Sequence, residues 1–244
     1  GHYAIPFQQV SLLLMGPGTT ISHDSLRLLA RHGTGLAAVG EDGVRIYTAP
    51  PLSGADSSIA RRQMQLWSRK RSRISVARKM YAWRLGRIVP HQDLDVLRGI
   101  EGSRVKAAYK ELAEHYGIEW RGRRYDRNSP EMADSPNQAI NHAATAMEAA
   151  AIIAVSAVRA VPQLGFIHED PGIALPLDIA DLYRISIIVP VAFQAVAEED
   201  REPGMGFDRR VRRIMGETLR RKQVIPDMID KLKELFGDGG DRYK

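Results

Sequence analysis

The sequence predicts an α+β protein, in which a small β-rich domain over residues 1–50 precedes a larger all-α domain over residues 57–236. Short apolar runs bounded by glycine and proline fill the first part of the chain. A proline-rich segment then interrupts them, and helical periodicity continues almost to the end. With 244 residues, 44% of them hydrophobic, the chain can bury a substantial core, and its length favours two modest domains.

The N-terminal domain is expected to contain three strands and one helix. Apolar runs over residues 10–15, 36–39 and 44–47 predict the strands, and the last two, separated by Glu41-Asp42-Gly43, predict a hairpin. Ser22 can accept a hydrogen bond from an exposed first-turn N–H, and the helical stripe that follows it stops at Gly33. A helix is therefore expected between the first and second strands.

The second domain is predicted to be a helical bundle. Residues 51–56 are expected to form the linker that leads into it, because the segment from Pro50 to Gly54 breaks the pattern. Periodic apolar positions predict helices over residues 57–85, 104–116, 136–158, 179–197, 208–222 and 225–236. The polar segment 117–134 is expected to be a long loop, and residues 237–244 a tail.

The composition favours a polyanionic partner. The formal net charge is +6, the pI is near 9.6 and the basic residues are clustered, so nucleic acid is the leading candidate. Because the chain has no cysteine, any metal must be held by oxygen and imidazole ligands, and a reducing cytoplasm is the expected location. No apolar run approaches the roughly 18 residues that span a bilayer, so we expect no membrane partner. The start, Gly1-His2-Tyr3, lacks an initiator methionine, and we expect sequence to be missing upstream.

Two clusters of basic residues are expected to contact DNA. The first contains no acid, so self-repulsion would disfavour its helix unless an anion lay against it, and duplex DNA is the expected counterpart. The second follows the candidate site, where it could position a scissile phosphate. The alternative is a pair of solvated basic faces, which the lack of nearby acids makes less favoured. The clusters comprise Arg61, Arg62, Arg69, Lys70, Arg71, Arg73, Arg78 and Lys79, and Arg209, Arg210, Arg212, Arg213, Arg220, Arg221 and Lys222.

A histidine and two carboxylates form a candidate metal site. His168 is followed ten residues later by Asp178, and Asp181 stands one turn further along a helix predicted to begin there. The three side chains could converge on one hard divalent cation. In a basic protein such a site suggests phosphodiester chemistry, in which Mg²⁺ or Mn²⁺ neutralises charge on the non-bridging oxygens and orients the attacking hydroxyl.

Glu101 is the candidate for a further ligand. It lies between Gly99 and Gly102 at the predicted start of a helix, where a backbone or a phosphate can approach closely. Structural roles are the alternative for all four site residues: a helix cap, partners of helix dipoles and a surface histidine.

Several ordered segments resemble the hallmark motifs of one family, the CRISPR-associated integrase, which is the first Cas protein and the catalytic subunit of spacer acquisition. They are Leu97-Arg98-Gly99-Ile100-Glu101-Gly102-Ser103-Arg104, Gly165-Phe166-Ile167-His168 and Asp178-Ile179-Ala180-Asp181. Further segments resemble the branch that works with type I-E systems, and together the matches cover nearly the whole chain. These are Pro17-Gly18-Thr19, Gly43-Val44-Arg45-Ile46-Tyr47, Gly122-Arg123-Arg124-Tyr125-Asp126 and Asp208-Arg209-Arg210-Val211-Arg212.

The resemblance implies a β-rich N-terminal domain, an α-helical catalytic domain, and a metal held by Glu101, His168 and Asp181. Asp178 would stand beside them in the catalytic set, as support or as an alternate ligand. The family acts as a homodimer, two of which flank a dimer of the small second Cas protein. Its reaction is a transesterification, in which a 3′-hydroxyl of double-stranded DNA with single-stranded 3′ ends attacks the CRISPR repeat.

DNA contacts are expected from basic side chains in and near these motifs, and from one tyrosine that could meet an unpaired 3′ end. These residues are Arg27, Arg45, Arg123, Arg124, Tyr125, Arg184, Arg209 and Arg212.

Two positions depart from the pattern of the family. Pro171 stands where this branch usually has a lysine, and Glu148 where a tyrosine is expected. The first strands of the family's N-terminal sheet are also absent, so that domain is expected to be incomplete. A transposon-type integrase with the same site and a non-catalytic DNA-binding subunit are the competing functions.

Overall fold

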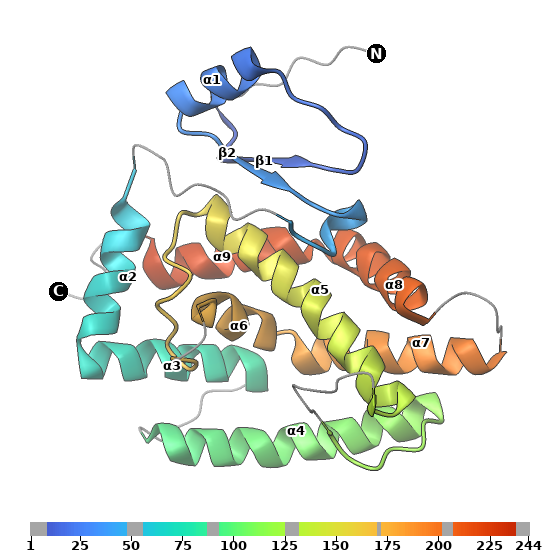
Figure 1. The fold of residues 1–244 in the computed structure, drawn as a ribbon. Coiled ribbons are helices and arrows are strands. Elements are labelled where there is room, and N and C mark those ends of the chain that lie inside the picture. The colour runs from blue at the N-terminus through green and yellow to red at the C-terminus, as the bar shows by residue number, and fades with distance from the viewer. Residues whose placement is uncertain are drawn as a thin grey trace.

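The computed structural model of the protein describes residues 9–47, 56–86, 93–124, 132–169, 172–201 and 207–237. It confirms the predicted α+β class, because a small unit with two strands and one helix lies on a larger body of helices (Figure 1). The predicted linker lies outside the described residues except for Asp56, and so does the predicted tail beyond Gly237.

The N-terminal unit is a β-α-β arrangement. Its elements are β1 (Leu12–Met15), α1 (His23–Arg31) and β2 (Gly35–Ala38). The two strands pair in parallel, with Leu12 opposite Gly35, and α1 makes the crossover between them. As predicted, Ser22 begins the helix, its side chain accepting a hydrogen bond from the backbone N–H of Ser25.

The predicted hairpin is reduced to one bridge. Val39 pairs with Ile46 in antiparallel fashion, but residues 44–47 form no strand, and a short 3-10 helix, η2 (Glu41–Gly43), lies between the two bridged residues. The turn at η2 contacts the helical body instead, because the Asp42 carboxylate pairs with Arg220 of the helical domain. The prediction of a third strand is therefore wrong.

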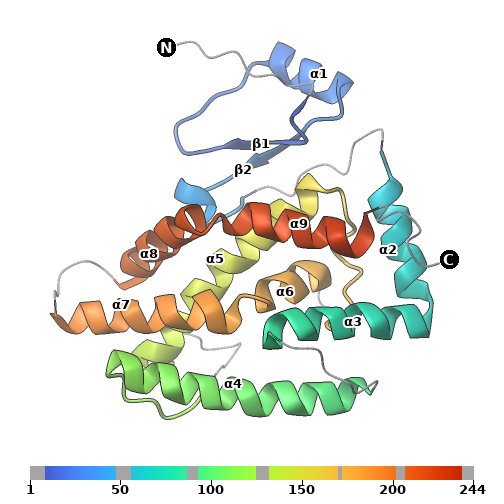
Figure 2. The ribbon, with the colours of Figure 1, turned by 180° about the vertical axis from the view of Figure 1, so that it is seen from behind.

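The predicted helix 57–85 is two helices, α2 (Ser58–Ser68) and α3 (Lys70–Leu85), that meet at a corner (Figures 1 and 2). Arg69 has extended backbone angles and separates them. Tertiary contacts explain the break, because Gln63 donates to the carbonyls of Val161 and Leu164 at 2.9 and 2.8 Å. These bonds hold α2 against the loop that leads to His168.

Two further predicted boundaries are wrong, and both change the setting of a site residue. Helix α4 (Leu94–Tyr116) begins ten residues earlier than predicted, capped by Asp93. The predicted helix 179–197 is replaced by α6 (Ala174–Asp181), a π-helical turn, η4 (Arg184–Ile188), and α7 (Val189–Arg201). Glu101 therefore lies inside a helix, and Asp178 and Asp181 lie at the end of one.

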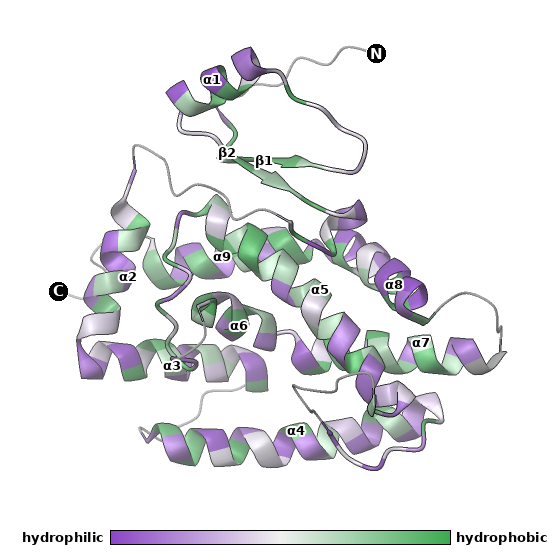
Figure 3. Ribbon diagram, viewed as in Figure 1, coloured by the Kyte–Doolittle hydropathy of each residue, from purple (hydrophilic) through white to green (hydrophobic). Residues whose placement is uncertain are grey.

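Helix α5 (Ser135–Ala157) runs through the centre of the helical body and packs against α6, α7, α8 (Phe207–Arg221) and α9 (Val224–Phe236). Many buried positions of α5 are alanine, which lets these helices approach closely. In Figure 3 the strands and α6 are mostly hydrophobic, whereas α8 carries many hydrophilic residues. Among the described residues, α5 is the only single helix long and apolar enough to cross a membrane, and most of that stretch is buried in the protein.

Several contacts attach the N-terminal unit to the helices, besides the ion pairs of Asp42 with Arg220 and of Arg45 with Asp208. Ala37 and Val39 pack against Ile153 of α5. The Arg159 guanidinium, just beyond α5, donates to the Gly33 carbonyl at 2.7 Å. On α8, Gly216 lies so close to the Asp42 side chain that an added Cβ would come within 2.7 Å of it. The β-rich unit is therefore seated on a specific spot of the helical body.

Candidate active site

Three segments that are distant in the chain bring charged side chains together. The guanidinium of Arg84, near the end of α3, lies between Glu101 of α4 and Asp181 of α6. One terminal nitrogen is 2.7 Å from Glu101 Oε1, and the other is 3.3 Å from Asp181 Oδ2. The three side chains are only 8%, 16% and 15% exposed. The two predicted carboxylates thus face one shared positive group.

His168 is held in place by Asp178, whose side chain is completely buried. The Asp178 carboxylate accepts hydrogen bonds from the backbone N–H groups of Phe166, Ile167 and His168 at 2.6–3.0 Å, and Nδ1 of His168 lies 2.7 Å from Oδ1. With a carboxylate as partner, Nδ1 carries the proton and Nε2 is left free to bind a ligand. Both oxygens of Asp178 are used in this way, so we assign it to positioning His168.

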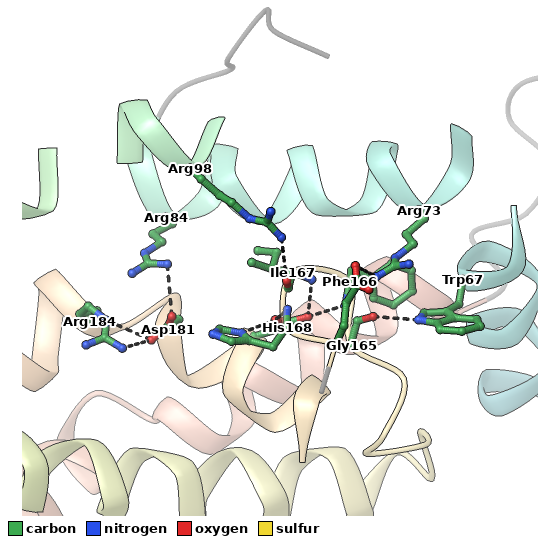
Figure 4. Close-up of polar contacts among 12 residues, drawn as sticks. Trp67, Arg73, Arg84, Arg98, Gly165, Phe166, Ile167, His168, Asp181 and Arg184 are labelled. Carbon is green, nitrogen blue, oxygen red and sulfur yellow. Dashed lines mark hydrogen bonds and ion pairs between the residues drawn. The ribbon is translucent and has the colours of Figure 1, made fainter. Parts of the chain in front are cut away.

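Figure 4 shows the His168 ring lying toward Asp181, on the loop that begins at Gly165. That loop is anchored on its other side, where Trp67 Nε1 donates to the Gly165 carbonyl at 2.9 Å. The hydrogen bond that the His168 ring donates to the Asp178 carboxylate raises the pKa of His168, and burial opposes the rise. The sequence-based alternative of a plain surface histidine does not describe this side chain.

Asp181 is bound from a second direction by Arg184, the first residue of η4. Arg184 Nε donates to Asp181 Oδ1 at 3.0 Å, and a terminal nitrogen contacts the same oxygen (Figure 4). Burial alone would lower the pKa of the Arg184 guanidinium, and Asp181 raises it above its usual range. Asp181 is thus held between two arginines.

These residues line a pocket of about 1000 Å³ between α3, α4 and the segment 167–184. Several cationic and aromatic side chains complete its wall: Arg98, Lys106, Lys110, Arg123, Tyr81, Tyr109 and Trp120. Tyr109 and Trp120 stack with ring centroids 5.2 Å apart. A Cβ added to Gly99 or Gly102 would meet nothing within 4 Å, so the surface of α4 beside Glu101 is open to an approaching backbone. The pocket can therefore take a phosphate-bearing strand.

Burial and like charge perturb the carboxyl groups of this region. Burial raises the pKa of Glu101, Arg84 opposes the rise and Asp181 adds to it. Glu148 of α5 behaves similarly: burial and then Asp181 raise its pKa, while Arg184 and His168 lower it. The sequence identified Glu148 only as a departure from the family pattern. The structure adds it to the electrostatic environment of Asp181.

The expected DNA-contacting residues fall in separate places. Arg123 and Arg184 line the first pocket, and Arg45, Arg209 and Arg212 line a second pocket of about 530 Å³ between η2 and α8. Arg123 is held by Asn137 and Asn141, and the backbone N–H of Arg124 donates to Asn137. Arg27 lies on α1, paired with Asp24, and Tyr125 lies outside the described residues, as does Pro171.

The two basic clusters differ in their partners. On α8, Arg210 and Arg213 pair with acids of α7 or of α8 itself, Arg212 with Asp208, and Arg220 with Asp42. The prediction that this cluster lacks nearby acids is therefore wrong. In the first cluster Arg73 pairs with Glu169 and Lys79 with Glu234.

The remaining exposed cations of the first cluster form the basic corner of α2 and α3. These are Arg61, Arg62, Arg69, Lys70 and Arg71. Within the described part of the chain none of them has an acidic partner, and Arg61 bonds only to the Ser57 hydroxyl. Arg69 is the N-cap residue of α3, and Lys70 and Arg71 are its first two residues, where positive charge opposes the helix dipole. This corner keeps its charge available to an external anion.

The donor set fits a hard divalent cation. Two carboxylates already face one cationic group, and the imidazole beside them has its other nitrogen fixed by a buried carboxylate, as is usual for metal-ligating histidines. As the side chains stand, no three histidine or acidic groups of the described residues form a complete cation cluster. The Arg84 guanidinium occupies the space between the carboxylates.

The chain resembles known proteins over most of its length. The family model described as CRISPR associated protein Cas1 matches residues 82–227, which include all four site residues. The CRISPR-associated endonuclease Cas1 of Escherichia coli K12 is 36% identical over 236 residues, covering 96% of this chain and 76% of that protein. The relative from Clostridium sp. SY8519, with the same name, is 38% identical, covering 84% of this chain and 69% of its own.

Solved structures share the fold. The crystal structure of the TtCas1–DNA complex superposes with a TM-score of 0.86 at 34% identity, covering 95% of this chain and 86% of that one. A casposase bound to integration product has a TM-score of 0.70 at 14% identity, covering 97% of this chain and 87% of its own, which shows a common fold alone. On the family match and on relatives more than 30% identical over most of both chains, this chain belongs to the Cas1 family of CRISPR-associated proteins.

Proposed function

We propose that the protein is a metal-dependent DNA endonuclease and integrase of CRISPR adaptation, which joins prespacer 3′-hydroxyl ends to the CRISPR repeat. The relatives named CRISPR-associated endonuclease and the Cas1 structure solved with DNA support this function. The observation that carries it is the pair of carboxylates, Glu101 and Asp181, that face one cationic group in a pocket lined by basic side chains.

In this proposal Glu101, His168 and Asp181 hold Mg²⁺ or Mn²⁺. The bound ion would neutralise charge on the scissile phosphate and orient the attacking hydroxyl. Asp178 fixes the imidazole tautomer, which would leave Nε2 as the atom that can bind the ion. Arg184 fixes the direction of the Asp181 carboxylate.

The basic wall of the pocket binds the DNA backbone. Arg98, Lys106 and Arg123 can contact phosphates, and Trp120, which is stacked on the buried Tyr109, can give an aromatic surface for an unpaired base. In the transesterification one phosphodiester bond forms from the prespacer 3′ oxygen and one breaks in the repeat. The proton of the attacking hydroxyl ends on the leaving 3′ oxygen. Because the number of phosphodiester bonds is unchanged, no external energy source is needed.

The basic corner of α2 and α3 is proposed as a further DNA contact. It lies at the far end of α3 from Arg84, about 20 Å away at 1.5 Å per helical residue. A strand whose reacting phosphate lies in the pocket can therefore reach the corner within a few nucleotides of duplex. We further propose that the protein acts in the cytoplasm as a homodimer with the small second Cas protein.

A strand-transfer assay tests the function. The full chain, with and without the second Cas protein, is mixed with a labelled duplex bearing 3′ overhangs and a supercoiled plasmid that carries a CRISPR repeat. We expect joining in Mn²⁺ or Mg²⁺, none in EDTA, and loss in E101Q, H168A and D181N. The control is D230N, which changes an exposed acid of α9.

Unchanged joining in H168A would reject the assigned site. Equal joining to plasmids with and without the repeat, together with a preference for mobile-element ends, would favour the transposon-type integrase. DNA binding without joining or cleavage in any metal would favour a non-catalytic subunit.

A further inference from the structure

Arg84 is the central group of the site, although no motif drew attention to it. Its side chain is 8% exposed and lines the pocket. The two terminal nitrogens of its guanidinium contact different carboxylates, Glu101 and Asp181, and its Nε has no hydrogen-bond partner. A buried donor without a partner is unusual, because it has lost its hydration and gained nothing in return.

We propose that Arg84 is an exchangeable internal counter-ion, which neutralises Glu101 and Asp181 until a divalent cation displaces it from between them. This inference rests on the proposed metal dependence of the site. It adds that ion binding is a replacement of one cation by another, and that the displaced guanidinium becomes available to a phosphate in the same pocket.

The charges of the site require some cation between the carboxylates. Two carboxylates that are about 85% buried and contact the same guanidinium would repel each other if that charge were absent, and burial disfavours the ionised form of a carboxylate. The guanidinium removes this penalty with two charge-assisted bonds. Without it, one carboxylate would take up a proton or the site would open.

The same position is the one a divalent ion requires. Mg²⁺ binds carboxylate oxygens at about 2.0–2.1 Å, closer than the nitrogens of a guanidinium approach. An ion shared by Glu101 and Asp181 therefore cannot coexist with a guanidinium held between the same oxygens, and the two cations also repel each other. One must leave when the other binds.

Arg184 differs from Arg84, because it cannot act as a counter-ion shared by Glu101 and Asp181. Both of its bonds to Asp181 go to a single oxygen, Oδ1, its other side-chain partner is Tyr109, and no ion pair joins it to Glu101 among the described residues. It can remain on Asp181 while the other carboxylate oxygen, Oδ2, turns to an ion. Of these two arginines, Arg84 is the one that contacts both carboxylates.

The pocket has room for the displaced guanidinium of Arg84. The pocket beside it has a volume of about 1000 Å³, and the surface of α4 near Gly102 is open. A DNA phosphate there would accept the hydrogen bonds that the carboxylates gave up. DNA and the ion would therefore favour each other's binding, because each stabilises the arrangement in which Arg84 has left the carboxylates.

Calorimetric titration of Mn²⁺ into the full chain tests the exchange. The variant R84M removes the competing cation and keeps the length of the side chain. We expect it to bind Mn²⁺ about tenfold or more tightly than the wild type, since charge-assisted bonds no longer have to be broken on binding. R84K keeps one positive charge and should fall between the two.

A matched control is R210M. Arg210 is 4% exposed and contacts two carboxylates, those of Glu198 and Glu199, but it lies outside the pocket. Its loss should weaken the fold and leave Mn²⁺ affinity unchanged. The proposed exchange would be rejected if R84M bound Mn²⁺ no more tightly than the wild type while R210M bound it with wild-type affinity.

A second measurement does not depend on any variant folding. In the ¹⁵N-labelled wild-type chain, the Arg84 Nε–H resonance is assigned and followed as diamagnetic Mg²⁺ is added, and it should shift in step with ion binding. Saturable ion binding without that shift would reject the role of Arg84 and leave the metal site standing. If the wild type bound neither ion, the metal dependence and the exchange would both fail.

Discussion

The completely buried carboxylate of Asp178 lies 2.7 Å from Nδ1 of His168 and also accepts the backbone N–H of the same residue at 2.9 Å. One side chain thus fixes both the backbone and the ring of the histidine. The remaining oxygen accepts the N–H groups of the two preceding residues, so the loop and the imidazole are oriented together.

D178N tests this relationship. An amide accepts fewer of these bonds and cannot stabilise a positive imidazolium, so the ring should lose its fixed tautomer. We expect about a 10–100-fold fall in Mn²⁺ affinity or strand transfer, the usual cost of losing a carboxylate behind a metal-ligating histidine. The comparison is H168A, which removes the ring itself. Wild-type affinity in D178N would show that the ring is oriented by something else.

The pKa of His168 gives a pH dependence. Asp178 raises this pKa above the usual 6.5, so the folded protein holds a proton there that the unfolded chain has lost. The stabilisation is complete below pH 6.5 and is lost as the pH rises through the folded value. We expect the free energy of unfolding of the wild type, relative to H168Q, to fall over this window. NMR titration of the ring should give a pKa above 6.5 in the wild type and a lower one in D178N.

Gly216 tests how the N-terminal unit is seated. In G216A the new Cβ would lie 2.7 Å from the Cβ of Asp42, and overpacking of this kind costs about 1–3 kcal/mol. G99A is the control, because Gly99 lies exposed inside α4 with nothing within 4 Å, and replacing a helical glycine there should stabilise by about 0.5–1 kcal/mol. Chemical denaturation measures both. Two variants of equal stability would contradict the close approach of Gly216 to Asp42.

The basic corner of α2 and α3 tests the expected binding of DNA. The variant R69Q/K70Q/R71Q should weaken duplex binding, and the dependence of log K on log[salt] should become shallower by about 0.9 for each phosphate that the protein no longer neutralises. R213Q/R220Q is the comparison, since both of those arginines already pair with acids. If R213Q/R220Q lost as much DNA affinity per removed charge as R69Q/K70Q/R71Q, the ion pairs of α8 would have to open when DNA binds.

The patterns along the chain predicted the fold class, the parts of the molecule that are helical, and the four residues of the candidate site. These features are local. Apolar spacing and caps such as Ser22 act over one or two turns, so they can be recognised without knowing what a segment packs against.

Two of the errors arose where a distant contact decided the outcome, and one arose from a misleading local signal. The corner at Arg69 is supported by bonds from Gln63 to a loop about a hundred residues away, and no breaker residue stands there. The start of α4 was missed because Gly99 and Gly102 favour a boundary locally, although the helix continues through both. The acids that pair with α8 come partly from α7 and η2, which lie outside its own sequence pattern.

The sequence by itself indicated most of the helical segments and the residue types of the candidate site, because both depend on residue type and short-range spacing. Only the tertiary structure decided how the site is charged. It buried Asp178 behind His168 and brought Arg84, an arginine in no motif, between Glu101 and Asp181. The physical reason is that electrostatic pairing depends on distance in space, and the tertiary fold brings side chains of α3, α4 and the segment 167–184 to one pocket, within 2.7–3.3 Å of their partners.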